Sequence, residues 1–569
     1  MSLWVVLLSV VALAIPAMIV FFAGMTATRR LWAGAPVLAP LYSTLVLALA
    51  SWVAFLATWA SPALGVVVSS VLLAAATLAF AWGGLWRQWR MAIPLVAVGA
   101  GVIALSLGFA YLWGVGNSPY DVVAERFFAF RMPADNLIPS LFAQKIADGQ
   151  STTGMLGDWN GGDRPPLQSG FALLFRPLSF LAEIVSGRPA SAAMPLDLSF
   201  ALDYLAQLLW IPAAFALLRV LSFPRWVAVA GICFAALVPA ILVNTLFTWP
   251  KVLSAALVLC SLAFLLAAKQ HPHRFRILFC SAVLAAVLAV LAHGAAAFTI
   301  PTLVATGLYA LHGQRLRSAV ATIAIAAGVG LVVYAPWVLY QRLVDPPGDR
   351  LLKWHLAGVT QVDPRPFAEA FTDQYSQLTF SEFVANRLEN LSTVFGSDQF
   401  ERLADGRFSL LTFLRVEDYT STMVAVGLIG LVLLVAMILN LAGRFRSLAP
   451  AEQQRLLIVV GMIVSVLVWS LVLFAPFSAI VPHGSHAWLF VLTLVPFCWL
   501  IERRPRTGLV LLGIQAALLV IVYFADIFHP DPHFSPTAAV VALAGLVVLL
   551  VVPAMLMRYR ARAIGAAGD

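Results

Sequence analysis

The chain contains about fifteen apolar stretches that are each long enough to cross a lipid bilayer, and this recurrence limits the possible folds most strongly. The stretches lie approximately at 3–23, 41–60, 63–83, 93–115, 199–221, 226–247, 250–268, 277–293, 298–312, 318–340, 420–443, 456–478, 486–501, 507–525 and 536–557. Only 11% of the residues are charged and 62% are hydrophobic, whereas a soluble protein has about 25% charged residues. So few charges cannot cover a soluble surface of this size.

The four cysteines all lie inside apolar stretches, without the spacing of a zinc site. The sequence therefore predicts an all-α polytopic membrane protein with about 13–15 transmembrane helices, and it excludes soluble, nucleic-acid-binding and disulfide-scaffold proteins.

The distribution of lysine and arginine predicts the orientation. If the turn at 29–30 faces the cytoplasm, twenty lysines and arginines fall in cytoplasmic turns, and Lys251 is the only one in a short turn on the other side. Positive residues favour the cytoplasmic side. The N-terminus and the two long loops, at 116–198 and 341–419, are then external, and the C-terminus is cytoplasmic. The net charge of +9 is explained by this asymmetry and does not require an anionic partner.

The loops divide the chain into five parts. These are a four-helix membrane segment (1–115), a first external loop (116–198), membrane core helices (199–340), a second external loop (341–419) and C-terminal membrane helices (420–569). We expect the acidic residues to lie in the loops, at helix ends or in the tail, with none at mid-membrane. Because ionisable residues inside a membrane often mark ion pathways, this arrangement argues against an ion-coupled transporter.

The first external loop carries two polar features. Asp135 precedes a helical pattern in which Ile138, Phe142 and Ile146 share one face, and the pattern ends at Gly149. This helix is short and amphipathic, so it is expected to lie in the membrane interface with Asp135 as its N-cap. The second feature is the run Gly161-Gly162-Asp163-Arg164-Pro165-Pro166-Leu167, where glycines permit a tight backbone and prolines stiffen it. An arginine held there suits a phosphate group, although an Asp163–Arg164 surface pair explains the spacing equally well.

These residues resemble the GT-C superfamily of integral-membrane glycosyltransferases, and most of all its lipid A aminoarabinose transferases and protein O-mannosyltransferases. In that branch an acid begins an interfacial helix of the first external loop, and an acid-Lys-Pro-Pro-Leu motif follows about thirty residues later. The matching positions here are Asp135 and the run from Asp163 to Leu167. The resemblance implies a polyprenyl-phosphate sugar as donor, Asp135 as the catalytic acid, and Arg164 in the place of the lysine that contacts the donor phosphate. It also implies a multi-pass protein of the bacterial inner membrane with a periplasmic active site.

Two departures keep alternatives open. The family usually has Asp-Glu where this chain has Asp135-Asn136, and its loop follows the first span, whereas here it follows the fourth. Asp121 and Glu125, four residues apart directly after a span, therefore remain candidates, as does Asp163. Their other interpretation is a solvated first helical turn.

Further candidates for the donor phosphate or sugar face the same side. Lys251 opposes the orientation rule, which suggests a purpose beyond snorkelling to lipid headgroups. The others are Arg350, Lys353, His355, His483 and His486. The two last histidines could bind a divalent metal, but no third ligand is fixed by spacing, so we expect no metal site and no cofactor.

The sequence as a whole predicts a glycosyltransferase that moves a sugar from a polyprenyl-phosphate donor to a lipid or glycan acceptor, with inversion and with aspartate as general base. An exporter of lipid-linked saccharides, or an O-antigen polymerase or ligase, is the alternative. Membrane lipids are expected partners and nucleic acid is not.

Overall fold

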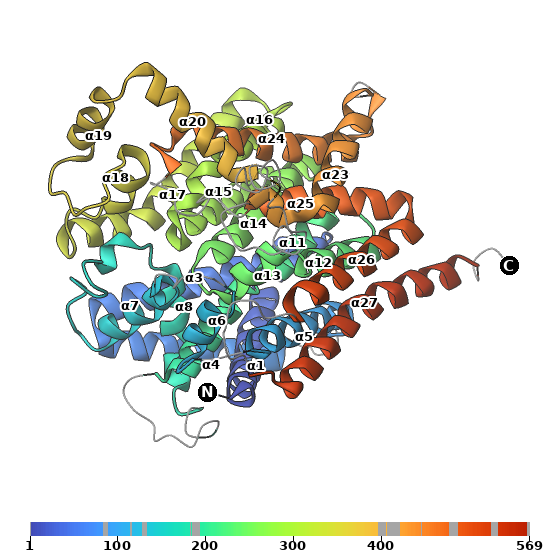
Figure 1. Ribbon diagram of the computed structural model, residues 1–569, viewed down its shortest axis with the longest axis horizontal. Helices are drawn as coiled ribbons and strands as arrows, with labels where there is room; N and C mark the ends of the chain where they lie inside the picture. Colours follow the sequence, from blue (N-terminus) through green and yellow to red (C-terminus); the bar gives the residue numbers. More distant parts are fainter. Residues whose placement is uncertain are drawn as a thin grey trace.

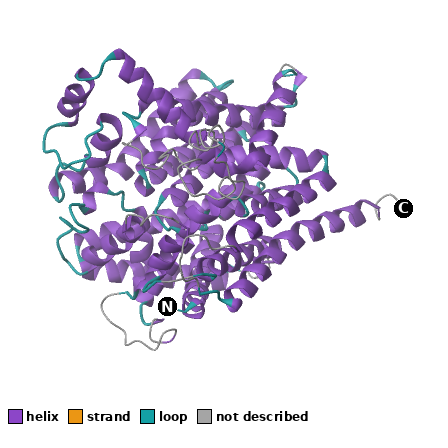
Figure 2. Cartoon of the chain, viewed as in Figure 1, coloured by secondary structure: helices purple, strands orange, loops and turns teal. Residues whose placement is uncertain are grey.

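The computed structural model describes residues 2–83, 89–113, 116–127, 134–181, 184, 194–395, 406, 422–444, 447–476, 487–524 and 533–565. Within these ranges the chain consists of helices and connecting loops, as Figure 2 shows, apart from one isolated bridge between Leu156 and Trp159. The prediction of an all-α membrane protein is confirmed.

Eleven helices or joined helix pairs of the described residues are long and apolar enough to span a membrane (Figure 1). They are α1 (Leu3–Ala27), α3 (Ala39–Ala60), α4 (Pro62–Trp82), α5 (Trp89–Tyr111), α10 with α11 (Leu196–Gln207, Trp210–Val220), α14 (Lys251–Gln270), α15 (Phe275–Ala292), η7 with α16 (Gly294–Thr299, Ile300–Leu311), α17 (Leu316–Leu343), α24 (Pro450–Val472) and α27 (Pro536–Gly565).

The remaining predicted stretches also form helices. The pair α12 (Arg225–Ala236) and α13 (Pro239–Leu246) is bent by 73° and makes a twelfth span if it is counted as one. Three further apolar helices are α23 (Thr422–Ala442), α25 (Ala487–Arg503) and α26 (Pro505–Phe524). Each of the fifteen predicted stretches therefore coincides with a helix or a helix pair. The short stretches at 277–293 and 298–312 belong to separate helices, α15 and α16, which the 3-10 turn η7 (Gly294–Thr299) connects.

Helix α14 lies at the centre of the bundle. All its residues from Lys251 to Ala268 are buried, and it packs against α3, α11, α15, α16 and α25. A helix that is apolar around its whole circumference can lie against lipid or against other helices, and the contacts of α14 place it among other helices. This position brings Lys251, the first residue of α14, to the point where several spans end.

The turns that are rich in arginine meet at one end of the bundle, which we call the basic face. Gln270 donates hydrogen bonds to the carbonyl of Val220 at 2.8 Å and to Gln454 at 3.0 Å. Arg274 reaches the carbonyl of Leu31 at 3.2 Å, and Arg455 pairs with Glu502 at 2.7 Å. Turns from five separate parts of the sequence thus share this face. The charge distribution predicts that these turns lie on the same side of the membrane, and their contacts agree with this prediction.

The two long loops meet at the opposite end, which we call the loop face. The first loop contains α6 (Pro119–Phe127), η3 (Ala134–Leu137), α7 (Ile138–Ala147), η4 (Gly161–Asp163), α8 (Leu167–Phe175) and η5 (Arg176–Leu178). The second contains α18 (Arg350–Ala357), α19 (Phe367–Ser376) and α20 (Phe380–Phe395). Figure 1 shows α7 and α8 of the first loop at the left of the molecule, below α18 and α19 of the second. Helix α8 is buried along its whole length between α3, α4, α7 and α10, so it anchors the first loop in the bundle.

The predicted amphipathic helix of the first loop is confirmed, with one correction at its start. Ile138, Phe142 and Ile146 are buried on one face of α7, and Gly149 follows with a left-handed backbone, φ 64°. The α-helical residues begin at Ile138, and Leu137 occupies the N-cap position. Asp135 lies instead in the preceding 3-10 turn η3, because the chain enters the helix through that turn. The prediction that Asp135 is the N-cap of α7 is therefore wrong.

Orientation is testable by labelling engineered cysteines in intact cells. Ser151→Cys and Ser376→Cys on the loop face should react with an impermeant thiol reagent, whereas Ser447→Cys and His273→Cys on the basic face should not. All four positions are exposed, and replacing serine by cysteine exchanges one atom. The native cysteines give little background, since three are buried and Cys280 lies in a spanning helix. Labelling of position 273 or 447 from outside would reverse the predicted orientation.

Candidate functional site

A cluster of aromatic and cationic side chains joins the two loops around Trp159. The guanidinium carbon of Arg350 lies 3.9 Å from the centre of the Trp159 ring, and that of Arg164 lies 4.7 Å from it. The ring of Trp354 stacks on Trp159 at 5.7 Å with an angle of 20° between the planes. We call Trp159, Arg164, Arg350 and Trp354 the tryptophan cluster. It brings together Arg164 and Arg350, two cationic residues that the sequence nominated from separate loops.

Two aspartates of the first loop hold Arg350 in this cluster. Asp158 accepts hydrogen bonds from Arg350 through its carboxylate at 2.7 Å and its carbonyl at 2.8 Å. This contact lowers the pKa of the Asp158 carboxyl below its ordinary value. Asp163 lies 3.9 Å from Arg350 and accepts a hydrogen bond from the backbone N–H of Asn160 at 2.9 Å. Burial raises the pKa of the Asp163 carboxyl, because the Asn160 bond and the nearby arginines offset only part of the desolvation.

Asp345 is the centre of the contact between the loops, although the sequence did not single it out. The carboxylate accepts hydrogen bonds from Thr152 at 2.7 Å, Thr153 at 3.1 Å, the backbone N–H of Gly162 at 2.8 Å and Tyr340 at 3.3 Å. Its side chain is buried with 2% of the residue exposed. A buried carboxylate with several donors fixes the position of the 161–164 turn relative to α17.

Replacement of Gly162 by alanine should separate the two loops. An added Cβ would lie 2.7 Å from the Cβ of Asp345 and 3.2 Å from its carbonyl oxygen, closer than real contacts allow. Both obstacles belong to a residue held on several sides, so the turn must move. We expect Gly162→Ala to lower the melting temperature and to increase proteolysis in the loops. Gly157→Ala provides the comparison for a glycine with open space around its Cβ position, although its φ of 61° adds local strain. Unchanged stability and protease resistance of Gly162→Ala would show that the loops are not packed as described.

A second buried carboxylate, Asp203 on α10, lies inside a candidate span, although the sequence analysis expected no acidic residue at mid-membrane. Asp203 is 1% exposed and belongs to the candidate span Leu196–Val220. It accepts hydrogen bonds from Tyr120 at 2.7 Å, Ser140 at 2.6 Å and Gln168 at 2.9 Å. The donors come from α6, α7 and α8, so the carboxylate tolerates burial by fixing the loop helices to α10. The signal in the sequence was a lone aspartate in an otherwise apolar stretch.

The segments that carry the predicted site residues meet at Thr248. Gln168 of α8, four residues after Arg164, donates a hydrogen bond to the Thr248 carbonyl at 2.6 Å. The Thr248 hydroxyl lies 3.5 Å from the carbonyl of Asn136, the neighbour of Asp135. Lys251 follows three residues later. The backbone of Thr248 is left-handed with φ 58°, which is rare for a β-branched residue and costs about 1–3 kcal/mol. Such strain persists only where the surroundings impose it, and it is concentrated at functional sites.

Lys251 occupies an unusual position for a cation. Lys251 is 2% exposed, and its ammonium nitrogen lies 3.4 Å from the centre of the Trp249 ring. It is also the first residue of α14, where the partial positive charge of the helix dipole is unfavourable for a cation. An anion bound beside Lys251 would be stabilised by both the ammonium group and the helix end.

Other predicted residues have contacts within the protein. Asp121 is exposed and accepts a hydrogen bond from the backbone N–H of Ser118 at 3.1 Å, which caps α6. Lys353 is buried and turned toward the segment after α18, where it pairs with Asp349 at 2.8 Å and donates to the carbonyl of Asp363 at 2.7 Å. The ring of His355 lies 6.2 Å from that of Trp354.

Some predictions fall outside the described part of the chain. The side chain of Asp135 is not described, although its backbone is part of η3. His483 and His486 lie outside the described residues. Among the described residues, no group of three or more His, Cys, Asp and Glu side chains is arranged to hold a metal ion.

Comparison with known proteins found one similar solved structure. Neither a protein-family model nor a curated protein matches the chain. The chain is similar to the crystal structure of ArnT from Cupriavidus metallidurans bound to undecaprenyl phosphate, over 83% of this chain and 72% of that one. The TM-score is 0.45 and the sequence identity 16%. The likeness concerns the arrangement of helices alone.

Proposed function

We propose that the protein is a polyprenyl-phosphate-dependent glycosyltransferase whose active site lies on the loop face, outside the cytoplasm. A lipid-linked sugar would reach this site by diffusion in the bilayer, and the acceptor would be a lipid or glycan of the cell envelope. The resident membrane is the bacterial inner membrane.

The observation that carries this proposal is the meeting of three separated segments at Thr248. Its contacts bring the turn before Lys251 against Asn136 and Gln168. Three segments are therefore neighbours at the ends of the spans. One carries Asp135, the expected base, and the other two carry Arg164 and Lys251, the expected phosphate ligands. A site that transfers a group from a lipid phosphate needs this combination of a carboxylate and cations at the membrane surface.

The donor phosphate would bind between the tryptophan cluster and Lys251. The guanidinium of Arg164 is planar and can contact two phosphate oxygens, while Lys251 supplies a compact charge next to a helix N-terminus. The indole faces of Trp159 and Trp354 could stack on a sugar ring. Arg350 and Lys353 would act by holding the second loop in place, since their contacts are with the protein.

The transfer would proceed by a single displacement. The aspartate takes the proton from the acceptor hydroxyl as its oxygen attacks the anomeric carbon, and the bond from that carbon to the phosphate oxygen breaks. The polyprenyl phosphate leaves with the electron pair, and Arg164 and Lys251 stabilise the growing charge. One displacement inverts the anomeric centre. Asp135 is the proposed base; Asp163, whose pKa is raised by burial, is the alternative within reach of the same arginines.

The direct test supplies the purified protein in proteoliposomes with polyprenyl-phosphate sugars and measures release of free polyprenyl phosphate. We expect release that depends on an envelope acceptor extract and that ceases in the Lys251→Ala variant. Movement of the intact donor across the bilayer without release would instead identify an exporter of lipid-linked saccharides.

Arg164 can be tested separately through the donor dependence. Arg164→Ala should raise the donor concentration needed for half-maximal rate and lower kcat/KM by about 10²-fold, since a charge-assisted contact to the leaving phosphate is lost. Arg164→Lys should retain part of the rate, because the charge stays but the bidentate geometry does not. Arg176→Ala, which removes a pair with Asp148 at 3.0 Å elsewhere in the loop, should have little effect. Equal activity of Arg164→Ala and the parent would remove Arg164 from the site.

A further inference from the structure

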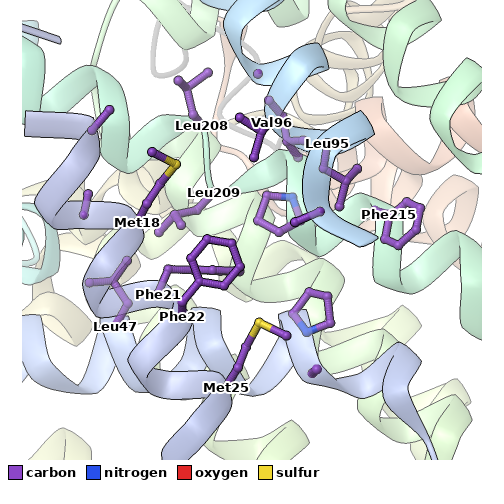
Figure 3. Close-up of a pocket in the computed structure, with 18 of the residues that line it drawn as sticks. Met18, Phe21, Phe22, Met25, Leu47, Leu95, Val96, Leu208, Leu209 and Phe215 are labelled. Carbon is purple, nitrogen blue, oxygen red and sulfur yellow. The ribbon is translucent and has the colours of Figure 1, made fainter. Parts of the chain in front are cut away.

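A large apolar cavity lies between α1, α3, α5 and the α10–α11 pair, and one end of it reaches the basic face. Its volume is about 830 Å³. Figure 3 shows Met18, Phe21 and Phe22 of α1 facing Leu95 and Val96 of α5 across it. Several lining side chains on the membrane-spanning surfaces are well exposed, among them Val11 and Ile15 at 54% each. The cavity is therefore a groove that opens sideways, toward the position of the lipid chains.

The groove extends from mid-membrane to the basic face. Along α1 it runs from Val11 to Met25, which corresponds to about 21 Å of helix. One leaflet contributes about 15 Å of the hydrocarbon thickness. The groove is thus long enough for the extended chains of a lipid in the leaflet at the basic face, and its lining is almost entirely aliphatic or aromatic.

Positive charge is placed at one end of this groove. Arg219, in the last turn of α11, and Arg225, the first residue of α12, both line it at the basic face, and His271 lies with them. Arg219 also donates a hydrogen bond to the carbonyl of Phe223, which positions its guanidinium at the turn. Two arginines above an apolar groove are complementary to an anionic headgroup above acyl chains.

We propose that this groove binds an anionic phospholipid of the leaflet at the basic face, with its phosphate at Arg219 and Arg225 and its chains along α1 and α5. The headgroup end is separate from the proposed donor site, because Arg219 and Arg225 lie at the opposite ends of the spans. The occupant is a lipid since the groove opens between spanning helices. The lipid is anionic because the guanidiniums of Arg219 and Arg225 line the end of the groove that faces the aqueous phase.

The experiment uses the full-length protein in nanodiscs made of equal amounts of phosphatidylglycerol and phosphatidylcholine, followed by native mass spectrometry of the released protein. We expect retained phosphatidylglycerol to exceed phosphatidylcholine by about tenfold, because two arginines favour an anionic headgroup. Arg225→Gln should reduce this preference, and the double variant Arg219→Gln with Arg225→Gln should abolish it. Arg315→Gln with Arg317→Gln, two exposed arginines of another turn on the basic face, should leave the preference unchanged.

A second set of variants fills the groove and leaves Arg219 and Arg225 unchanged. A Cβ added at Gly99, which lines the groove on α5, meets no atom within 4 Å, so Gly99→Phe fills space and should reduce lipid retention about tenfold. Gly328 on α17 has the same open surroundings but lies outside the groove, and Gly328→Phe should retain lipid like the parent. The proposal is overturned if the parent retains both lipids equally, or if Gly99→Phe retains as much lipid as Gly328→Phe. Melting curves establish that each variant is folded.

Discussion

Replacing Asp135 by asparagine should abolish most of the transfer activity and leave the protein folded. An amide cannot accept the proton of the acceptor hydroxyl at neutral pH, and a general base supplies about 10²–10⁴-fold in rate. We therefore expect turnover to fall by at least about 10²-fold. Folding should survive because Asn and Asp are similar in size and Asn is well tolerated at helix starts such as η3. The rate of polyprenyl phosphate release by purified protein measures the effect, with the melting temperature as the check on folding.

Asp121→Asn and Asp163→Asn should be prepared alongside it. Asp121 caps α6 through Ser118, and an asparagine oxygen can accept the same hydrogen bond, so this variant should stay active. Asp163→Asn weakens the hold on Arg350 and should lose less activity than Asp135→Asn if Asp135 is the base. Full activity of Asp135→Asn would transfer the role to Asp121 or Asp163. If all three variants remained active, the glycosyltransferase proposal would fail and the exporter would become the leading interpretation.

Replacing Asp203 by alanine should have the largest effect on stability. Tyr120, Ser140 and Gln168 each donate a buried hydrogen bond to the Asp203 carboxylate, and the substitution removes this acceptor. A buried donor that is left without its acceptor costs about 1–3 kcal/mol. Activity should fall as well, because Gln168 also holds the Thr248 carbonyl between the segments of the proposed site. Unfolding titrations in mixed micelles measure the free energy of unfolding.

Two variants separate this role from a general intolerance of α10 to substitution. Asp203→Asn keeps one acceptor oxygen and should lose less stability than Asp203→Ala. Asp197→Ala removes another buried carboxylate of the same helix, which accepts a hydrogen bond from Ser9 at 3.2 Å, and its cost should also be smaller. If Asp203→Ala were as stable as the parent, the network would not hold the loop helices to α10. The proposed neighbourhood of Asn136, Gln168 and Thr248 would then lose its support.

The sequence alone determined the helical architecture. Hydrophobic length is a local property, so the stretches at 3–23 or 250–268 could be recognised without knowledge of their neighbours, and each forms a helix. The grouping of the arginine-rich turns was also predictable, since charge at helix ends depends on the side of the membrane. The short amphipathic helix was visible from the spacing of Ile138, Phe142 and Ile146.

Only the tertiary structure decided which polar residues work together. Asp203 was hidden in an apolar stretch, and its role depends on donors of α6, α7 and α8 that are as far as 83 positions away in the chain. The sequence placed Arg350 and Lys353 together as phosphate ligands, but Lys353 turns toward Asp363 while Arg350 packs on Trp159. Thr248 had no signal in the sequence, because its left-handed backbone and its contacts with Gln168 and Asn136 belong to the tertiary structure. Hydrophobic periodicity and charge predict whether a residue faces lipid or water, because these preferences are local. The partners of a buried polar group depend instead on how helices that are distant in the sequence pack together.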